Sequence, residues 1–202
     1  MTLLKDLTAD RSIEWPWCIK HLPYDSTVLD VGCCHSIISQ SALYRRNYVT
    51  GIDLLDENNI KDPNFSFICD DFLSFSFPNL FDCIIACSTI EHIGLFGRYG
   101  SEASPDGDLL AIAKIKSLLK TGGTFILTIP LGKDAVFNPL HRVYGITRLP
   151  LILSGFEILF MQFWGKPNNN NWGQISSFDA LSLKASPDFY NLGLYVLNKF
   201  EA

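Results

Sequence analysis

The segment Val28-Leu-Asp-Val-Gly-Cys-Cys-His-Ser36 constrains the fold of this chain more than any other. It predicts a buried strand that ends near Asp30 and Gly32, followed by a turn of small residues and a helix. A second short strand, residues 48–53, ends in Asp53. In open α/β sheets such a unit binds an adenosine, because the backbone of the first turn approaches the ligand and the second-strand carboxylate accepts from the ribose hydroxyls.

Strand-like and helix-like runs alternate along the chain, which favours a doubly wound three-layer αβα sandwich. Helical spacing of leucine, isoleucine and alanine predicts a helix over 106–120, which Thr121-Gly122-Gly123 is expected to end. The expected strands lie near 27–31, 48–53, 65–69, 82–87, 123–130, 156–164 and 192–199. The other expected helices lie near 12–22, 36–46 and 143–153.

The end of the chain departs from a plain dinucleotide-binding fold. Its last two strands are separated by a segment rich in asparagine and glycine that predicts a loop without a helix. Such strands pair antiparallel more readily than parallel. We therefore expect a mostly parallel, seven-stranded sheet with an antiparallel C-terminal hairpin, in a single domain over residues 1–202.

Composition narrows the function classes. The formal net charge is −5, and only Arg45 and Arg46 are adjacent basic residues, so the basic surface typical of a nucleic-acid-binding protein is not expected. No secretory leader and no membrane-spanning run is predicted. The six cysteines lack a metal-site spacing such as two CxxC pairs, so we expect reduced thiols, no metal and a cytoplasmic protein.

Six short motifs together resemble the class I S-adenosylmethionine-dependent methyltransferases, in order and spacing, over nearly the whole chain. Within that fold the chain is similar to small stand-alone methyltransferases linked to surface-sugar biosynthesis. The motifs are Val28-Leu-Asp-Val-Gly-Cys33, Gly51-Ile-Asp53, Phe67-Ile-Cys-Asp-Asp71, Phe81-Asp-Cys-Ile-Ile85, Ser88-Thr-Ile-Glu-His92 and Leu118-Leu-Lys-Thr-Gly-Gly-Thr-Phe125.

The resemblance implies S-adenosylmethionine as cofactor and assigns residues to bind it. They are Arg11, Asp30, Gly32, Asp53, Leu54, Asp71, Phe72 and Ser88. Three assignments have alternatives: Asp53 as a cap of the turn that follows it, Asp70 in place of Asp71 at the adenine, and Arg11 in a surface salt bridge. Arg11 is expected to pair with the cofactor carboxylate, a geometry that suits a guanidinium.

One residue departs from the family pattern. The glycine-rich turn of the family usually has a second glycine where this chain has Cys34. If that position required a positive φ, cysteine would cost on the order of 1 kcal/mol. The expected consequence is a cofactor that lies farther from the turn or binds weakly.

The catalytic candidates are Glu91 and His92, which follow the fourth expected strand at the edge where such sheets bind ligands. His92 has a suitable pKa range for taking a proton from an acceptor, and packing is its alternative role. Acceptor contacts are expected from Arg98, Tyr99, His141 and Arg142, with ordinary surface packing as the alternative for His141 and Arg142. We expect a small-molecule acceptor, with a nucleotide sugar or a glycan as candidates, and a site that is open or completed by a second subunit of a homodimer.

Two other functions compete with methyl transfer. A nicotinamide-dependent oxidoreductase shares the first strand–turn–helix–strand unit, but the second and third glycines of GxGxxG and a Tyr-x-x-x-Lys dyad are missing. A catalytically inactive methyltransferase-like binding or scaffold protein stays open, because of Cys34 and because no residue is a decisive base.

Overall fold

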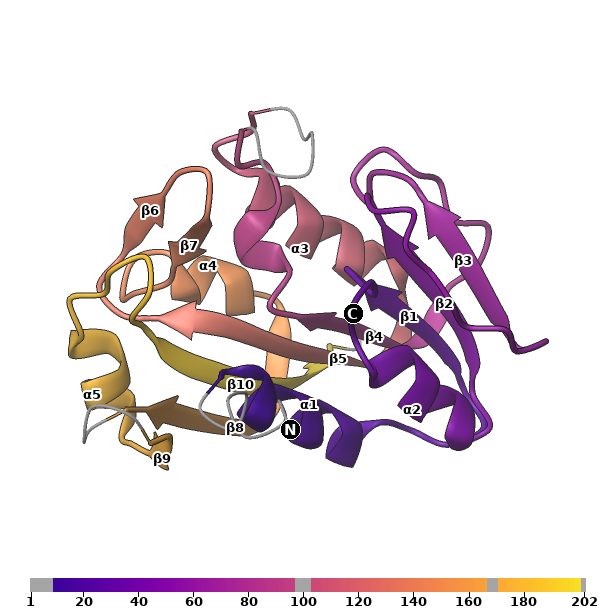
Figure 1. Ribbon diagram of the computed structural model, residues 1–202, viewed down its shortest axis with the longest axis horizontal. Coiled ribbons are helices and arrows are strands. Elements are labelled where there is room, and N and C mark those ends of the chain that lie inside the picture. Colours follow the sequence, from indigo (N-terminus) through magenta and orange to yellow (C-terminus); the bar gives the residue numbers. More distant parts are fainter. Residues whose placement is uncertain (1–8, 97–102, 167–170, 201–202) are drawn as a thin grey trace, which may run out of the picture.

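The computed structural model describes residues 9–96, 103–166 and 171–200. Its centre is an eight-stranded sheet in the order β3-β2-β1-β4-β5-β10-β8-β9, with helices on both faces (Figure 1). The strands are β1 (Thr27–Val31), β2 (Tyr48–Asp53), β3 (Phe65–Cys69), β4 (Phe81–Cys87), β5 (Leu119–Leu131), β8 (Phe156–Gly165), β9 (Gly173–Gln174) and β10 (Asn191–Lys199). The predicted three-layer α/β fold is confirmed, and the expected seven strands become eight through β9.

The strand order reverses at β1. Strands β2 and β3 lie on one side of β1, and β4 and β5 lie on the other, all in parallel pairing. Such a switch point opens a crevice at the carboxyl ends of the strands, where sheets of this type bind ligands. The residues after β1, β2 and β4 therefore meet at one edge.

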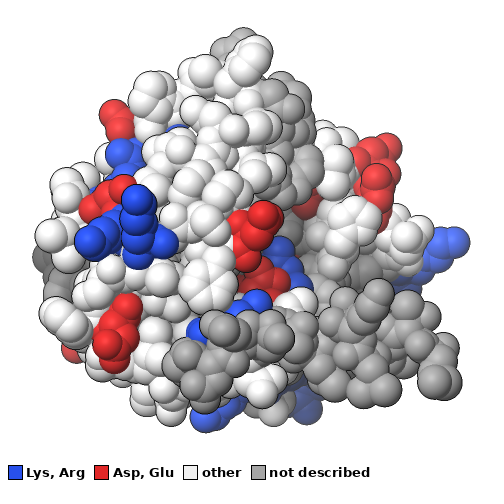
Figure 2. Space-filling view, turned by 60° about the vertical axis from the view of Figure 1, so that its left-hand side comes forward, with Lys and Arg blue, Asp and Glu red and all other residues white. Residues whose placement is uncertain are grey.

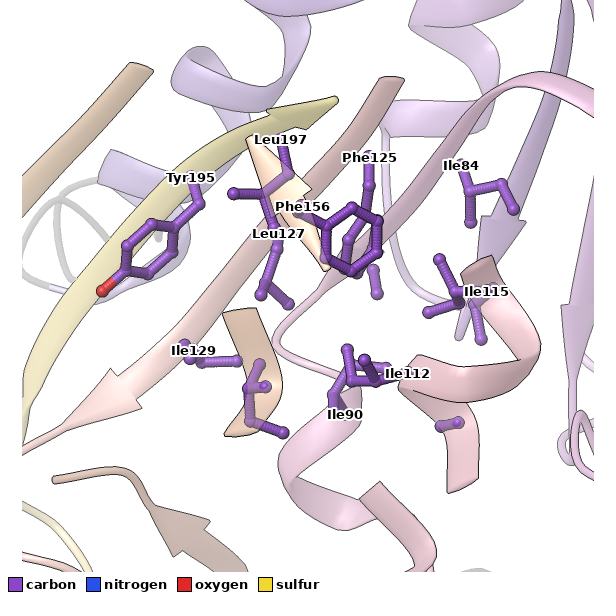
Figure 3. Packing of buried hydrophobic residues seen from close by; sticks show 14 of the residues in the cluster. Ile84, Ile90, Ile112, Ile115, Phe125, Leu127, Ile129, Phe156, Tyr195 and Leu197 are labelled. Carbon is purple, nitrogen blue, oxygen red and sulfur yellow. The ribbon is translucent and has the colours of Figure 1, made fainter. Parts of the chain in front are cut away.

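The helices divide between the two faces of the sheet. Helices α1 (Arg11–His21) and α2 (Ile38–Tyr44) cover one face, and α3 (Gly107–Leu118) and α4 (Leu149–Leu153) cover the other (Figure 1). Figure 3 shows the core under α3, where isoleucines of the helix meet phenylalanine and leucine side chains of β5 and β10. Trp17 and Cys18 of α1 pack in the separate core of the opposite face.

The antiparallel C-terminal pair is confirmed, but its arrangement differs from a plain hairpin. Strand β10 lies between β5 and β8 and is antiparallel to both. The connection from β8 to β10 contains β9 and a short helix, α5 (Ser177–Ser182), where a loop was predicted. Ser176 caps α5 by accepting from the Asp179 backbone, a local signal for a helix start.

The helix predicted over 143–153 is wrong in its first half. Strand β7 (His141–Val143) pairs with β6 (Ala135–Phe137) as a separate two-stranded sheet, and α4 starts only at Leu149. Asp134 accepts from three backbone amides just before α4, those of Gly145, Thr147 and Arg148. These contacts hold residues 145–148 in a turn, so the helix begins only after them.

The helix predicted over 106–120 ends at Leu118, and β5 begins at the next residue. Leu119 already pairs with Phe81 of β4, so the chain enters the sheet before the glycines. The Gly122 turn lies within β5 as an irregularity with φ +71°. The two glycines thus bend a strand and do not end a helix.

Candidate functional site

A cavity of about 530 Å³ lies at the carboxyl ends of β1, β2 and β4. Its size falls in the range of small-molecule and cofactor sites. Seven of the eight predicted cofactor residues line it, namely Arg11, Gly32, Asp53, Leu54, Asp71, Phe72 and Ser88. His92 also lines it, whereas Asp30 and Glu91 lie behind the wall.

The turn after β1 depends on Gly32. Its φ is +76°, and a Cβ built there would lie 2.4 Å from Thr89 Oγ1. The Gly32 amide donates to the Ile52 carbonyl at 2.8 Å, which ties this turn to β2. The second positive φ of the turn belongs to His35, at +59°, and not to Cys34. The condition for strain at Cys34, a positive φ, is therefore not met, and Cys34 donates its amide to Asp53.

Asp53 ends β2 with its carboxylate in the cavity wall. Its Oδ2 accepts from the Cys34 amide at 2.9 Å, and its Oδ1 accepts from the Leu55 amide at 3.0 Å. The turn-capping role, given above as the alternative, is thus present. A carboxylate has about four lone-pair sites, so each oxygen retains capacity to accept from a ligand hydroxyl.

Asp30 lies beneath this wall. It is 1% exposed, and Ser39 Oγ donates to its Oδ2 at 2.6 Å. Burial raises the pKa of Asp30 to about 6, with Ser39 acting in the opposite direction. Its place behind the lining residues suits an indirect influence on a ligand.

An apolar slot with acidic neighbours forms the far end of the cavity. Leu54 and Phe72 both line it, and Phe72 is buried while Leu54 is exposed. Asp70 and Asp71 line the same end, and each also accepts from a nearby backbone amide. Both carboxylates therefore remain candidates for contact with the exocyclic amine of an adenine.

Sequence reasoning missed Glu14 as a functional residue. It is fully buried on α1, and its Oε2 accepts from Arg11 Nη1 at 2.7 Å. Its Oε1 accepts from Ser88 Oγ at 2.5 Å and from Thr128 Oγ1 at 2.6 Å. Burial raises the pKa of Glu14, while Arg11 acts to lower it. Glu14 thereby holds Arg11 and Ser88 in the cavity wall.

His92 and Glu91 lie on a short 3-10 helix, η2 (Ile90–His92), directly after β4. His92 Nδ1 is 2.7 Å from the Leu140 carbonyl, which can only accept, so Nδ1 carries the proton and Nε2 is the basic nitrogen of the neutral ring. Glu91 Oε1 lies 3.8 Å from Nε2. Glu91 is 1% exposed, and its Oε2 has no hydrogen-bond partner among the described residues.

The predicted acceptor residues divide into two groups. Arg98 and Tyr99 lie outside the described residues. His141 and Arg142 are buried in β7, and neither lines the cavity. Arg142 donates to the Ile93 carbonyl at 2.6 Å and to the Ser104 carbonyl at 3.1 Å. It therefore anchors the two segments that flank residues 97–102.

Basic and acidic side chains lie interspersed on the described part of the face in Figure 2, with no extended surface of one sign. No helix in the described ranges 9–96, 103–166 and 171–200 is long and apolar enough to cross a membrane.

Solved structures share this fold at low sequence identity. A 1,6-didemethyltoxoflavin-N1-methyltransferase of Burkholderia thailandensis, with bound 1,6-didemethyltoxoflavin and S-adenosylhomocysteine, has a TM-score of 0.67 at 17% identity, over 98% of this chain and 82% of its own. The N-methyltransferase NodS of Bradyrhizobium japonicum WM9, bound to S-adenosylhomocysteine, has a TM-score of 0.56 at 16% identity, over 98% and 97%. The [4+2]-cyclase SpnF has a TM-score of 0.56 at 19% identity, over 99% and 81%. These comparisons show the fold and leave the reaction open.

At the level of sequence, no curated protein matches the chain. One family model matches residues 57–179, and its description is "Caenorhabditis protein of unknown function, DUF268". The match runs from the loop after β2 to α5 and so includes Asp70, Asp71 and His92.

Proposed function

The chain belongs to the DUF268 family, and on the basis of its fold and cavity we propose that it is an S-adenosylmethionine-dependent methyltransferase that acts on a small molecule. The link to surface-sugar biosynthesis, the cofactor and the site assignments are all part of this proposal. The methyltransferase-like fold supports the proposal, and the charge of the cavity wall is its strongest single support.

The wall is acidic. Among the described residues, it holds three carboxylates, those of Asp53, Asp70 and Asp71, against one guanidinium, that of Arg11. S-adenosylmethionine has a sulfonium and an ammonium against one carboxylate, so it suits a wall of this sign. A nicotinamide dinucleotide has a diphosphate, which would lie near these carboxylates at a cost. The cavity therefore favours the methyl donor over the competing oxidoreductase cofactor.

The geometry of the wall fits the parts of the cofactor one by one. Asp53 would accept from the ribose hydroxyls, and Gly32 leaves the space that a side chain would fill. The slot of Leu54 and Phe72 would hold the adenine, with Asp70 or Asp71 at its exocyclic amine. At the other end, Arg11 would pair with the carboxylate of the methionine part, held in position by Glu14.

S-adenosylmethionine supplies a reactive methyl group, so the protein has mainly to align the acceptor and manage its proton. His92 is placed for the second task. The Leu140 carbonyl fixes its Nδ1 proton, so Nε2 is the nitrogen that would take the proton of an acceptor hydroxyl or amine. Buried Glu91, at 3.8 Å, would stabilise the imidazolium that results whenever Glu91 is ionised.

The acceptor would enter beside His92, where the wall continues through Ile93, Gly94 and Ser104. These residues flank the segment that contains Arg98 and Tyr99. The side chains of Arg98 and Tyr99 can form hydrogen bonds and would suit a polar acceptor. We propose a nucleotide sugar or glycan precursor as the first class to test. A second subunit of a homodimer would complete an otherwise open acceptor site.

The proposal is tested by methyl transfer from S-adenosylmethionine labelled in its methyl group. The purified protein is incubated with a panel of small molecules that includes nucleotide sugars and simple amines. We expect label in one acceptor class and S-adenosylhomocysteine in equal amount. Binding of the cofactor without transfer to any acceptor would favour the inactive scaffold, and absence of cofactor binding would contradict the site assignment as well.

A further inference from the structure

Two cysteines and a carboxylate meet where the turn after β1 approaches the end of β2. One ligand atom each of Cys33, Cys34 and Asp53 lies within 4.8 Å of the others. Adjacent residues in a strand point to opposite faces of the sheet, so neighbouring thiols do not normally converge. Here the left-handed backbone at Gly32 and His35 encloses the pair in a tight turn and brings both sulfurs to the same carboxylate.

The backbone of β2 leaves space for one of these thiols. A Cβ built on Gly51 would lie 2.7 Å from Cys33 Sγ, so any larger residue would displace the sulfur. Cys33 is 7% exposed, and Cys34 lines the cavity and is more accessible. The group thus has one ligand fixed in the protein wall and one beside the opening.

The charge around the group also favours a cation. Asp30 is fully buried nearby, and its carboxylate and that of Asp53 repel each other. In the part of the chain that the structure describes, no lysine or arginine forms an ion pair with either carboxylate. A bound cation would compensate this negative charge.

We infer that Cys33, Cys34 and Asp53 form a binding site for a divalent cation that prefers sulfur ligands, such as Zn²⁺ or Cd²⁺. Two thiolates and one carboxylate are a donor set that such ions accept. Each thiol releases its proton to the solvent as its sulfur binds the ion, and no oxidant or reductant takes part. Metal–sulfur bonds of about 2.3 Å place tetrahedral ligands about 4 Å apart, so small side-chain rotations close the site and leave one position for water.

The site would regulate the proposed methyltransferase, a consequence that rests on the proposed function. Asp53 serves both as a metal ligand and as the acceptor for the cofactor ribose. A cation bound by Asp53 and Cys34 would also lie in the cavity wall. The cation and the cofactor would therefore exclude each other, and the ion would act as a reversible inhibitor.

The test uses Cd²⁺ and the full-length protein, and it follows the ultraviolet cadmium–thiolate charge-transfer absorption without cofactor. We expect the wild type to give an absorption that saturates at one ion per chain. Cys34→Ser should lose it, and Asp53→Asn should weaken Cd²⁺ binding. Cys69→Ser is the matched control, because this exposed thiol lies outside the three-residue group and its loss should leave the absorption unchanged. Circular dichroism shows whether each variant has folded. If Cys34→Ser has not folded, the site is judged by Asp53→Asn, and Cd²⁺ binding as tight as in the wild type would overturn it.

Cadmium absorption of equal strength in wild type and Cys34→Ser, or none in the wild type, would overturn the site. The second arm adds S-adenosylhomocysteine and measures the Cd²⁺ affinity again. A reduction in that affinity supports the regulatory role, and an unchanged affinity in a protein that binds both ligands overturns it. A protein that binds Cd²⁺ through Cys34 but never binds S-adenosylhomocysteine would retain the metal site and contradict the proposed function alone.

Discussion

Arg11 Nη1 donates to Glu14 Oε2 at 2.7 Å, from one turn of α1 to the next. The pair connects α1 to the end of β4 and to the interior of β5, because Ser88 and Thr128 donate to the other oxygen of Glu14. The Arg11 side chain is 39% exposed and that of Glu14 is 0% exposed. The buried carboxylate is thus the fixed end of the pair, and it directs the guanidinium into the cavity.

The first prediction follows from this pair. Glu14→Gln replaces the carboxylate that faces Arg11 with an uncharged amide. Arg11 then loses the negatively charged partner that positions it. We expect S-adenosylhomocysteine to bind about tenfold more weakly, equivalent to about 1.4 kcal/mol, as measured by calorimetric titration. The matched control is Asp25→Asn, which breaks the exposed ion pair with Arg46 and should leave the affinity unchanged. Equal affinities in wild type and Glu14→Gln would show that the Glu14 carboxylate does not position Arg11 for cofactor binding.

The second prediction separates backbone strain from contact at the cofactor turn. Gly32 and Gly122 have similar φ values, +76° and +71°, but a Cβ would meet Thr89 at Gly32 and nothing within 4 Å at Gly122. Gly122→Ala should cost about 1–2 kcal/mol of unfolding free energy from the backbone alone. Gly32→Ala should cost at least about 1 kcal/mol more, because Thr89 must move. Urea unfolding measures both, and equal losses would contradict the close approach of Thr89.

The third prediction concerns Glu91 and pH. Burial raises the pKa of Glu91 from 4.5 to about 8, so the folded protein retains a proton that the unfolded chain releases between these values. The folded state then binds more protons than the unfolded state, and this group makes stability fall as pH rises from about 4.5 to about 8.

Glu91→Gln removes that dependence. Relative to wild type it should gain stability on the order of 4 kcal/mol at pH 8 and almost none at pH 4.5, because an amide has no proton to lose. Chemical unfolding at the two pH values measures the difference. A constant difference between the variant and wild type across this range would contradict the raised pKa.

The fourth prediction tests His92 as the base. His92→Ala should lower kcat about a hundredfold with any acceptor that is turned over, which is the lower end of the range for general bases. The dissociation constant of S-adenosylhomocysteine should not change. His21→Ala is the control, because His21 packs on Trp17 and Phe160 outside the cavity. An unchanged kcat in His92→Ala would leave His92 as a packing residue.

Local sequence was enough to predict the parts of the fold that local interactions decide. The first strand, the glycine turn after it and the carboxylate of Asp53 at the end of the second strand follow from patterns of a few residues. Because these patterns mark the carboxyl ends of parallel strands, they also placed Gly32, Asp71 and His92 at one edge, and all three line the same cavity. The order of the motifs along the chain was thus enough to predict which of these residues lie together at the cavity.

The features that were missed depend on partners distant in sequence. Glu14 looks like an ordinary helix residue until Ser88 and Thr128 meet it, and these are 74 and 114 positions away. The same holds for β7, where Arg142 is engaged by carbonyls 49 and 38 positions before it. A surface role for Arg142 is the natural expectation for a guanidinium, and only tertiary contacts reverse it.

Calorimetric titration of S-adenosylhomocysteine into the wild type, Asp53→Ala and Asp56→Ala is the decisive experiment for the cofactor site. Asp53 lines the cavity, whereas Asp56 is exposed and does not. We predict that the wild type and Asp56→Ala bind equally and that Asp53→Ala binds more weakly by roughly 1–3 kcal/mol, through loss of charge-assisted hydrogen bonds to the ribose. Absence of binding to the wild type, or equal binding to Asp53→Ala, would contradict the assignment of this cavity to the cofactor.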